Sequence, residues 1–267
     1  MPKVPTLPKP PRGWHFSDIL YSIYEQRLIN RLDKKRLPKH VAVLADGNRR
    51  WARTNAPGQP LVVGYRQGAQ KLLEFTNWCN QMEIPTVTLW VLSTENLQRS
   101  EDDELNPLLD VIASLVEKLA NRWRVQVVGD PSLLPAQIAS RLHSAEQLSA
   151  LHQGMHVNVA VAYGGRRELR DAVRGVLKAE AEKGTTLMEL AETLDIEQIS
   201  KHLYTAGQPD PDLIIRTSGE QRLSGFLMWQ SAHSEFYFCE ALWPDFRKVD
   251  FFRALRSFSQ RERRYGR

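Results

Sequence analysis

Cysteine is scarce in this 267-residue sequence, which contains only Cys79 and Cys239. Two cysteines cannot build the disulfide framework of a small secreted protein, so we expect a protein of the reducing cytoplasm. Long apolar runs are also missing, because Val87–Leu92 is typical of the longest and a membrane-spanning helix needs roughly 20 residues. The first residues, Met-Pro-Lys-Val-Pro, lack the apolar segment of a signal peptide. These absences exclude a transmembrane protein and favour a cytoplasmic location.

Several common binding motifs are absent as well. The sequence has no G-x-x-x-x-G-K-[ST] for nucleoside triphosphates and no G-x-G-x-x-G after its first predicted strand for dinucleotides. His152 and His156 are four residues apart, but Gly154 weakens the helix that would align them on a metal ion, so a loop is the better interpretation. The composition, 42% hydrophobic and 25% charged residues, is typical of a globular protein and excludes intrinsic disorder.

Positive charge is concentrated at the two ends of the chain. Residues 1–40 contain nine Lys/Arg against three Asp/Glu, and residues 247–267 contain eight against two. Residues 41–246 contain 19 against 26, a net charge of −7. A basic end can be a solvated face, or it can bind nucleic acid, an anionic membrane surface or a phosphorylated ligand. Neither end has a known nucleic-acid-reading motif, so we expect no nucleic-acid partner.

The chain divides into three predicted parts. Five prolines within residues 1–11 predict an extended, mobile arm over residues 1–14. Apolar residues at helical spacing predict an amphipathic helix over residues 15–37, which either packs in a core or dimer contact or lies peripherally on an anionic membrane. Residues 38–267 form the third part, which we expect to be one domain.

Short β-rich runs alternate with long helical patterns in this third part. We expect strands at His40–Ala45, Thr86–Leu92, Val125–Val128, Val157–Tyr163 and Leu213–Thr217, and helices near 64–82, 104–121, 135–149, 165–183 and 249–264. Phe226–Gln230 and Phe236–Cys239 are candidates for two more short strands. Such alternation predicts an α/β fold, a single domain with a mostly parallel central sheet and helices on both faces.

The first predicted strand ends at a polar cluster. Ligands of open parallel sheets bind beyond the carboxyl ends of the strands, where Asp46 is followed by Gly47, Arg49 and Arg50. A carboxylate suits a hard divalent cation and arginines suit phosphate oxygens, so this cluster fits a magnesium-bridged diphosphate. The alternative is that Asp46 or Asn48 caps a helix and the arginines are solvated.

Two other segments bear on the same chemistry. Arg216, Arg222 and Ser224 follow the fifth predicted strand and could hold a second diphosphate. Glu235 lies in an aromatic stretch and therefore needs an arginine or a metal as its partner. The acidic run Glu101–Glu104 resembles a metal-binding cluster, but its place at the start of a predicted helix favours helix capping.

Five motifs together resemble the cis-prenyltransferases, the undecaprenyl diphosphate synthase family. They are His40–Ala52 (HVAVLADGNRRWA), Ser93–Asn96 (STEN), Asn158–Arg166 (NVAVAYGGR), Asp210–Glu220 (DPDLIIRTSGE) and Trp243–Phe246 (WPDF). The resemblance covers roughly residues 38–267, which would then be the catalytic domain. It implies a Mg²⁺-dependent homodimer with a hydrophobic product tunnel, which condenses isopentenyl diphosphate with an allylic diphosphate and creates a Z double bond.

The resemblance also implies roles for single residues. Asp46 and Asn96 correspond to the catalytic pair, with Asp46 and Glu235 as metal ligands and Asn96 assisting proton removal. Substrate contacts are implied for Gly47, Asn48, Arg49, Arg50, Trp51, Tyr65, Ser93, Thr94, Glu95, Arg99, Arg216, Arg222, Leu223 and Ser224. Arg264 corresponds to a residue that reaches the partner's diphosphates across the dimer interface.

Departures from the family pattern indicate a short product. Gly is usual at Arg49 and His at Tyr65, long-chain members often have an arginine at Leu61, and Trp is usual at Leu97. Val91 stands where long-chain enzymes have a small residue, and forcing extra methylenes into a filled core costs roughly 1–3 kcal/mol. The sequence is therefore most similar to the short-chain Z-isoprenyl diphosphate synthases, which make (2Z,6E)-farnesyl diphosphate. A long-chain synthase and a non-catalytic partner subunit of a prenyltransferase complex are the alternatives.

Overall fold

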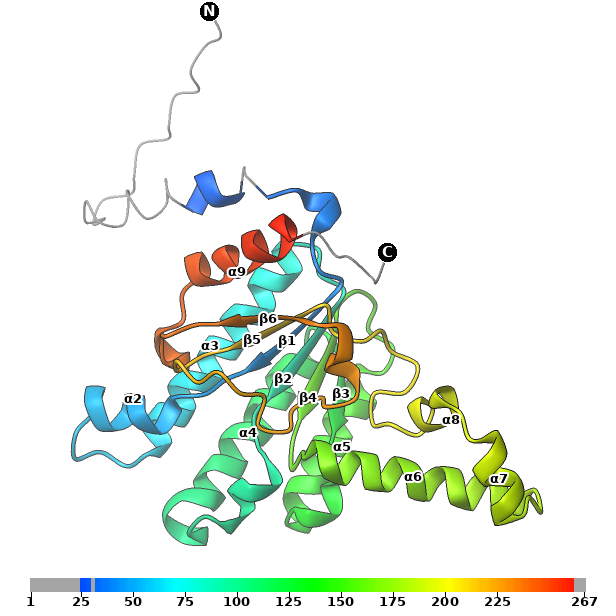
Figure 1. The fold of residues 1–267 in the computed structure, drawn as a ribbon. Coiled ribbons are helices and arrows are strands. Elements are labelled where there is room, and N and C mark those ends of the chain that lie inside the picture. Colours follow the sequence, from blue (N-terminus) through cyan, green and yellow to red (C-terminus); the bar gives the residue numbers. More distant parts are fainter. Residues whose placement is uncertain (1–24, 30–31, 262–267) are drawn as a thin grey trace, which may run out of the picture. The chain divides into compact units, whose positions relative to one another are not determined.

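The computed structural model describes residues 25–29 and 32–261. They fall into two compact units: residues 38–246 form the larger one, and the N-terminal residues before 38 group with those after 246. The larger unit contains the whole sheet (Figure 1). It therefore contains every strand end at which the sequence predicts a site.

Six parallel strands form one sheet in the order β3-β4-β2-β1-β5-β6 (Figure 1). The strands are β1 (His40–Leu44), β2 (Thr86–Trp90), β3 (Arg124–Val128), β4 (His156–Ala160), β5 (Leu213–Arg216) and β6 (Glu235–Phe238). The central strands are buried along nearly their whole length, as expected for a parallel sheet covered on both faces. The predicted α/β class and parallel sheet are confirmed. Each of the five main predicted strands is found, and its ends differ from the predicted ends by no more than three residues.

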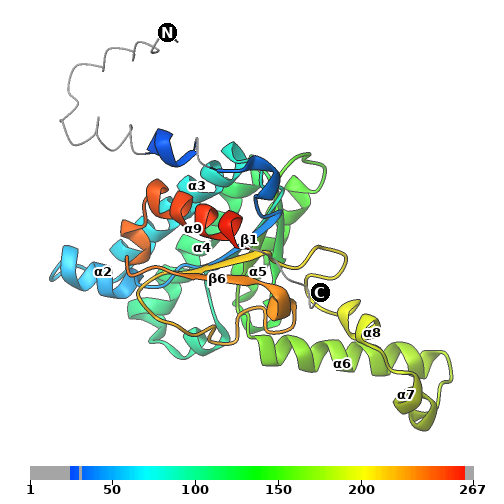
Figure 2. The ribbon, with the colours of Figure 1, turned by 45° about the horizontal axis from the view of Figure 1, so that its top comes forward.

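The helices are α2 (Asn48–Asn55), α3 (Val62–Gln81), α4 (Asn106–Ala120), α5 (Ala136–Ser149), α6 (Gly165–Glu182), α7 (Leu187–Thr193), α8 (Ile196–Ser200) and α9 (Lys248–Gln260). In the larger unit, α3, α4 and α5 contact one another in turn and pack against the sheet. Helix α6 extends away from the sheet and has α7 and α8 at its far end (Figures 1 and 2). The 3-10 turns are Lys34–Arg36, Thr94–Gln98, Pro131–Leu133, Gln230–His233 and Trp243–Asp245, and Glu101–Leu105 is one π turn.

Three short helices, α2, α7 and α8, were not expected from the sequence. Helices α7 and α8 both begin with a capping box, Thr186 with Glu189 and Asp195 with Gln198, and this signal could have located them. Helix α2 has no side-chain cap at all, so the sequence offers no such signal there.

The predicted strand Phe226–Gln230 is wrong. Positive φ angles at Ser224, Gly225 and Leu227 prevent an extended run, and the segment forms turns that lead into a 3-10 turn. Its apolar residues are buried nevertheless: Phe226 stacks on Trp90 with ring centroids 5.0 Å apart and packs in a cluster on the sheet with Leu44. In the sequence, the buried aromatic and apolar residues of this loop therefore resemble those of a strand.

The predicted arm at residues 1–14 and most of the predicted helix at 15–37 lie outside the described residues. Residues 25–29 are helical. Residues 32–37 do not continue that helix but form a bend and a 3-10 turn, in which the Asp33 side chain accepts a hydrogen bond from the Lys35 amide. Among the described residues, no helix combines the length and apolarity needed to cross a membrane.

Candidate active site

The segments that follow β1 and β5 meet at the carboxyl edge of the sheet. β1 and β5 are neighbours, so Asp46 and Arg216 lie together although 170 residues separate them. Arg216 donates from Nη2 to Asp46 Oδ2 over 3.1 Å. The Thr217 hydroxyl joins the same two segments, because it donates to the Asp46 carbonyl and accepts from the Asp46 amide. The predicted diphosphate segments are therefore adjacent.

Gly47 turns the chain from β1 into α2. Its φ of +110° is unfavourable for other residues, and a Cβ there would lie 2.9–3.0 Å from atoms of Leu242. Gly47 is the N-cap of α2, and no side chain caps this helix. The capping alternative for Asp46 and Asn48 is therefore wrong, and the amino end of α2 is left without a side-chain acceptor.

Arg216 organises the loop that follows β5. It is only 4% exposed, and from Nη1 it donates to the Ser224 hydroxyl over 2.8 Å and to the Arg222 carbonyl. The Arg222 side chain is exposed and ion-pairs with Glu220. Positive φ angles recur in this loop, for example at Gly219. A buried guanidinium thus holds a strained loop that presents a second, exposed guanidinium.

The segment after β2 forms a compact turn. Ser93 and Asn96 make a reciprocal capping box at the start of the 3-10 turn Thr94–Gln98. Ser93 also bridges to Tyr163, which follows β4. The Asn96 carboxamide accepts from the Ser93 amide at 3.3 Å, so its oxygen helps to shape the turn.

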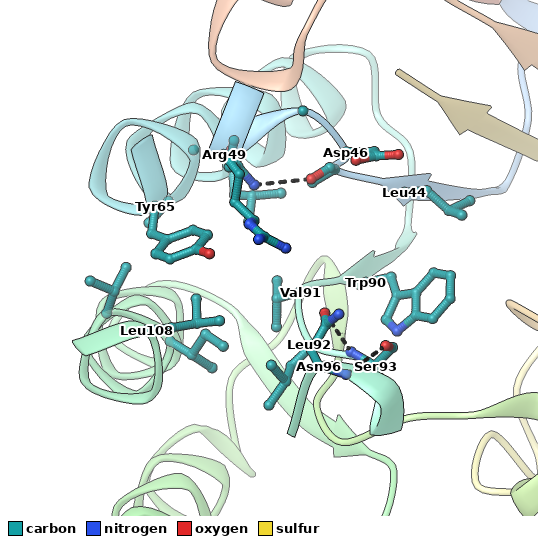
Figure 3. A pocket seen from close by; sticks show the side chains of 18 of the residues that line it. Leu44, Asp46, Arg49, Tyr65, Trp90, Val91, Leu92, Ser93, Asn96 and Leu108 are labelled. Carbon is teal, nitrogen blue, oxygen red and sulfur yellow. Dashed lines mark hydrogen bonds between the residues drawn. The ribbon is translucent and has the colours of Figure 1, made fainter. Parts of the chain in front are cut away.

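A cavity of about 740 Å³ lies beneath these segments. One part of its wall is polar and contains Asp46 and Asn96, which Figure 3 labels, together with Arg216. The rest is apolar and comes mainly from the residues directly after β2, from α3 and from α4: Leu72, Val91, Leu92, Leu108, Val111, Ile112 and Leu115. Such a cavity suits a ligand with an anionic head and a hydrocarbon tail.

Four charged or polar side chains meet beside this cavity. Glu104 Oε1 lies 3.3 Å from Arg49 Nε and 3.2 Å from Arg99 Nε, and it accepts a hydrogen bond from the Tyr65 hydroxyl. Burial of the Tyr65 hydroxyl is the larger cause that raises the pKa of Tyr65, and this hydrogen bond is the next. Tyr65 therefore stays protonated. As expected, the acidic run Glu101–Glu104 begins a helical segment, because its π turn leads directly into α4, but no side chain caps that segment and Glu104 instead pairs with the two arginines. Sequence reasoning missed this residue.

The structure does not bring all the predicted residues to the cavity. Glu235 begins β6 and pairs in register with Leu213, the first residue of β5, whereas Asp46 contacts Arg216, the last residue of β5. Glu235 therefore lies toward the amino edge of the sheet, and this chain does not join it to Asp46 as a metal pair. Arg264 lies outside the described residues.

The remaining predicted contacts fall into two groups. Nine of them line the cavity: Gly47, Asn48, Arg49, Arg50, Tyr65, Ser93, Glu95, Arg99 and Ser224. The other four do not line it: Trp51, Thr94, Arg222 and Leu223. The Trp51 indole instead donates to Asp245, and Leu223 packs against the aromatic cluster on the sheet. His152 lies in a loop and His156 on β4, and no group of three potential metal-ligating side chains occurs among the described residues.

The fold and the cavity together define a class of protein, an α/β protein with a cavity at the carboxyl edge of a parallel sheet, whose polar wall suits an anionic head group and whose apolar wall suits a hydrocarbon chain. The family model described as "putative undecaprenyl diphosphate synthase" matches residues 44–266. The chain belongs to this prenyltransferase family, which confirms the resemblance found in the sequence.

Individual relatives agree with this assignment. The chain is 56% identical to a (2Z,6E)-farnesyl diphosphate synthase of Thermobifida fusca over 248 residues, 92% of this chain and 97% of that protein. It is 53% identical to a short-chain Z-isoprenyl diphosphate synthase of Mycobacterium bovis over 263 residues, 97% of this chain and 98% of that one. Among solved structures, lavandulyl diphosphate synthase from Lavandula x intermedia, in complex with dimethylallyl diphosphate, matches with a TM-score of 0.79 and 35% identity over 87% of this chain and 100% of that one.

Proposed function

We propose that this enzyme condenses isopentenyl diphosphate with a short allylic diphosphate, geranyl diphosphate, and releases (2Z,6E)-farnesyl diphosphate. The single observation that most supports this is the contact between Asp46 and Arg216, which joins the two arginine-bearing segments at the mouth of an apolar cavity. Two diphosphates bound there would lie side by side with their hydrocarbon parts in one cavity. The names of the relatives support the same product class.

We assign the allylic diphosphate to the start of α2. Its uncapped backbone N–H groups and the side chains of Arg49 and Arg50 are suitable donors for phosphate oxygens. Isopentenyl diphosphate is assigned to the loop after β5, with the Arg222 guanidinium and the Ser224 hydroxyl as donors. Arg216 contacts both segments and therefore fixes the spacing between the two head groups.

Magnesium fits the donor set at this edge. Among the described residues, arginine side chains contact Oδ2 of Asp46, which leaves Oδ1 as a hard oxygen ligand, and the carboxylate is 42% exposed. Mg²⁺ is commonly held by one or two carboxylates together with substrate phosphates and water. When bound, the ion would neutralise charge on the leaving diphosphate. We assign its protein contact to Asp46 alone, because Glu235 begins β6 at the other end of the strands.

The reaction breaks one bond and forms another. The allylic C1–O bond breaks, inorganic diphosphate leaves with the electron pair, and the alkene of isopentenyl diphosphate forms a C–C bond to that carbon. A proton is then lost from C2 of the isopentenyl unit to a phosphate oxygen of the released diphosphate, and the electrons of the C–H bond restore the double bond. Arginines and the α2 amides stabilise the negative charge that develops on the leaving group. Asn96 lines the cavity. Its carboxamide is a poor base, so we assign it the role of orienting the diphosphate that accepts the proton.

Val91 is the proposed limit on chain length. It directly follows β2 and lines the cavity opposite α4, where Leu108 and Ile112 also line the wall. A growing chain must pass these side chains. We therefore propose that elongation stops after one condensation.

Incubating the purified protein with Mg²⁺, radiolabelled isopentenyl diphosphate and dimethylallyl, geranyl or (E,E)-farnesyl diphosphate tests the proposal. We expect one labelled C15 product, formed from geranyl diphosphate and lost when the metal is chelated. A product of 50 or more carbons would contradict the short-chain assignment, and no product with any primer would support the non-catalytic subunit. Light scattering of the same sample tests the proposed homodimer, and sedimentation with anionic vesicles tests the proposed cytoplasmic location against peripheral membrane contact.

A further inference from the structure

The Glu104 carboxylate contacts side chains from three other segments of the cavity wall. Arg49 comes from α2, Tyr65 from α3 and Arg99 from the turn that follows the Ser93–Asn96 segment, while Glu104 lies on the π turn before α4. The Glu104 side chain is 11% exposed and that of Arg99 is 17% exposed. This buried carboxylate therefore links segments that the proposed reaction requires to act together.

Two of these side chains contact the same carboxylate oxygen, because Arg49 Nε lies 3.3 Å from Glu104 Oε1 and the Tyr65 hydroxyl donates to it. The Tyr65 hydroxyl also accepts from Arg99 Nη1 at 3.1 Å. The Arg99 guanidinium lies 5.8 Å from the centroid of the Tyr65 ring. These contacts join the four side chains into one connected cluster.

The cluster controls how the two arginines are presented. Both approach Glu104 through Nε, and two guanidinium groups so close together would repel each other without the shared negative charge. The Arg49 side chain is 43% exposed and extends toward the cavity in Figure 3. Among the described residues, neither of its terminal nitrogens donates a hydrogen bond to a protein atom. Those two nitrogens form the planar fork that binds phosphate oxygens in pairs.

We propose that Glu104 is a positioning residue for the allylic diphosphate. It holds Arg49 and Arg99 side by side so that the terminal nitrogens of Arg49 face the cavity. This inference rests on the proposed function, since it concerns the substrate of the same site. Glu104 itself does not touch the reacting atoms.

The test replaces Glu104 by Gln, which keeps the size of the side chain and removes its charge. We expect Glu104→Gln to raise the KM for geranyl diphosphate about tenfold, the usual scale of a charged hydrogen bond, with kcat changed less than about threefold. The KM for isopentenyl diphosphate should not change. The matched control is Glu101→Gln, which removes an exposed carboxylate of the same π turn and should leave both KM values unchanged.

A double-mutant cycle shows whether Glu104 acts through Arg49. Arg49→Gln should raise the same KM, and adding Glu104→Gln to it should raise that KM less than twofold further. Three results would overturn the proposal. The effects of Glu104→Gln and Arg49→Gln on this KM could multiply independently, or Glu104→Gln could leave the KM unchanged, or it could lower the KM. If Glu104→Gln does not fold, Arg49→Lys, which keeps the charge and removes the fork, should show the same KM-specific effect. Wild-type activity distinguishes a failure of this inference from a failure of the proposed function. If the wild type forms the C15 product but the double-mutant cycle shows no coupling, only this inference is contradicted.

Discussion

Two groups of polar side chains on and beside the central strands differ in charge and in hydrogen bonding. From the amino end of β1 to the middle of β2 and β4, His40, Thr88, Asn158 and Gln208 form a chain of hydrogen bonds whose first three members are at most 1% exposed. The His40 Nδ1–H donates to the Pro209 carbonyl, so Nε2 accepts from the Thr88 hydroxyl. All of these side chains are neutral and hydrogen-bonded, as expected for a chain that stabilises the fold.

The carboxyl edge is charged and incompletely paired. Of the seven buried polar side-chain atoms without a hydrogen-bond partner among the described residues, five lie there: Asn48 Oδ1, Arg49 Nε, Trp90 Nε1, Arg216 Nε and Ser218 Oγ. The other two are His156 Nε2, at the start of β4, and Gln230 Oε1. Asp46, at the carboxyl edge, is 42% exposed. Buried polar atoms without partners are costly for folding, so their concentration at one edge indicates a surface shaped for a ligand rather than for stability.

The largest expected effect comes from Asp46→Asn, which removes the charge at the carboxyl edge. We expect kcat to fall at least about a thousandfold, the scale found when a preorganised electrostatic contact in an active site is lost. The free energy of unfolding should change by only about 1 kcal/mol, because Asp46 is half-exposed and Arg216 keeps its other acceptors. Steady-state kinetics and urea unfolding measure the two quantities.

The matched control for that variant is Glu83→Gln, an exposed carboxylate just before β2, at the opposite end of the strands. It should keep full activity. Activity retained in Asp46→Asn would show that the Asp46 carboxylate has only a local structural role.

The next effect concerns the amino end and appears as a dependence of stability on pH. Burial lowers the pKa of His40 to about 4 from 6.5. Between these values the unfolded chain binds a proton that the folded chain does not, so the free energy of unfolding falls as pH drops from about 6.5 to 4, by roughly 3 kcal/mol in all.

Because several carboxylates titrate in the same window, the informative quantity is the difference between wild type and His40→Gln. We expect the variant to be less stable at pH 7 and to lose less stability on acidification, as measured by chemical unfolding at a series of pH values. Parallel profiles for the two proteins would mean that the pKa of His40 is the same in the folded and the unfolded state, which would contradict the account.

A smaller effect is expected from Val91→Ala, which enlarges the cavity wall without touching the charged edge. Removing a steric barrier of roughly 1–3 kcal/mol should allow a second condensation and give products longer than C15. Chromatography of the labelled products measures the distribution. An unchanged C15 product would place the length limit elsewhere, with Leu108 on α4 as the next residue to test.

Much of this fold follows from sequence periodicity. The five main strands and the longer helices are predicted because apolar runs and helical spacing reflect burial directly, and the parallel order then brings the segments after β1 and β5 to one edge. The contact between Asp46 and Arg216 is consistent with that prediction.

The sequence could not predict features that depend on distant neighbours. The role of Glu104 requires α2, α3 and the turn after β2 to converge on it, and local pattern suggests only a cap. Likewise, the register of β6 places Glu235 at the amino edge, and no feature of the aromatic stretch around it reveals that end. The loop at Phe226 resembles a strand because its apolar residues are buried without being extended.

The most direct test of the central claim is a crystal structure of the protein with Mg²⁺, isopentenyl diphosphate and an unreactive thiolo analogue of geranyl diphosphate. The account predicts one diphosphate at the start of α2 and the other on the loop after β5, on either side of the contact between Asp46 and Arg216. A structure with either diphosphate bound away from this edge, or with both hydrocarbon chains outside the cavity, would contradict it.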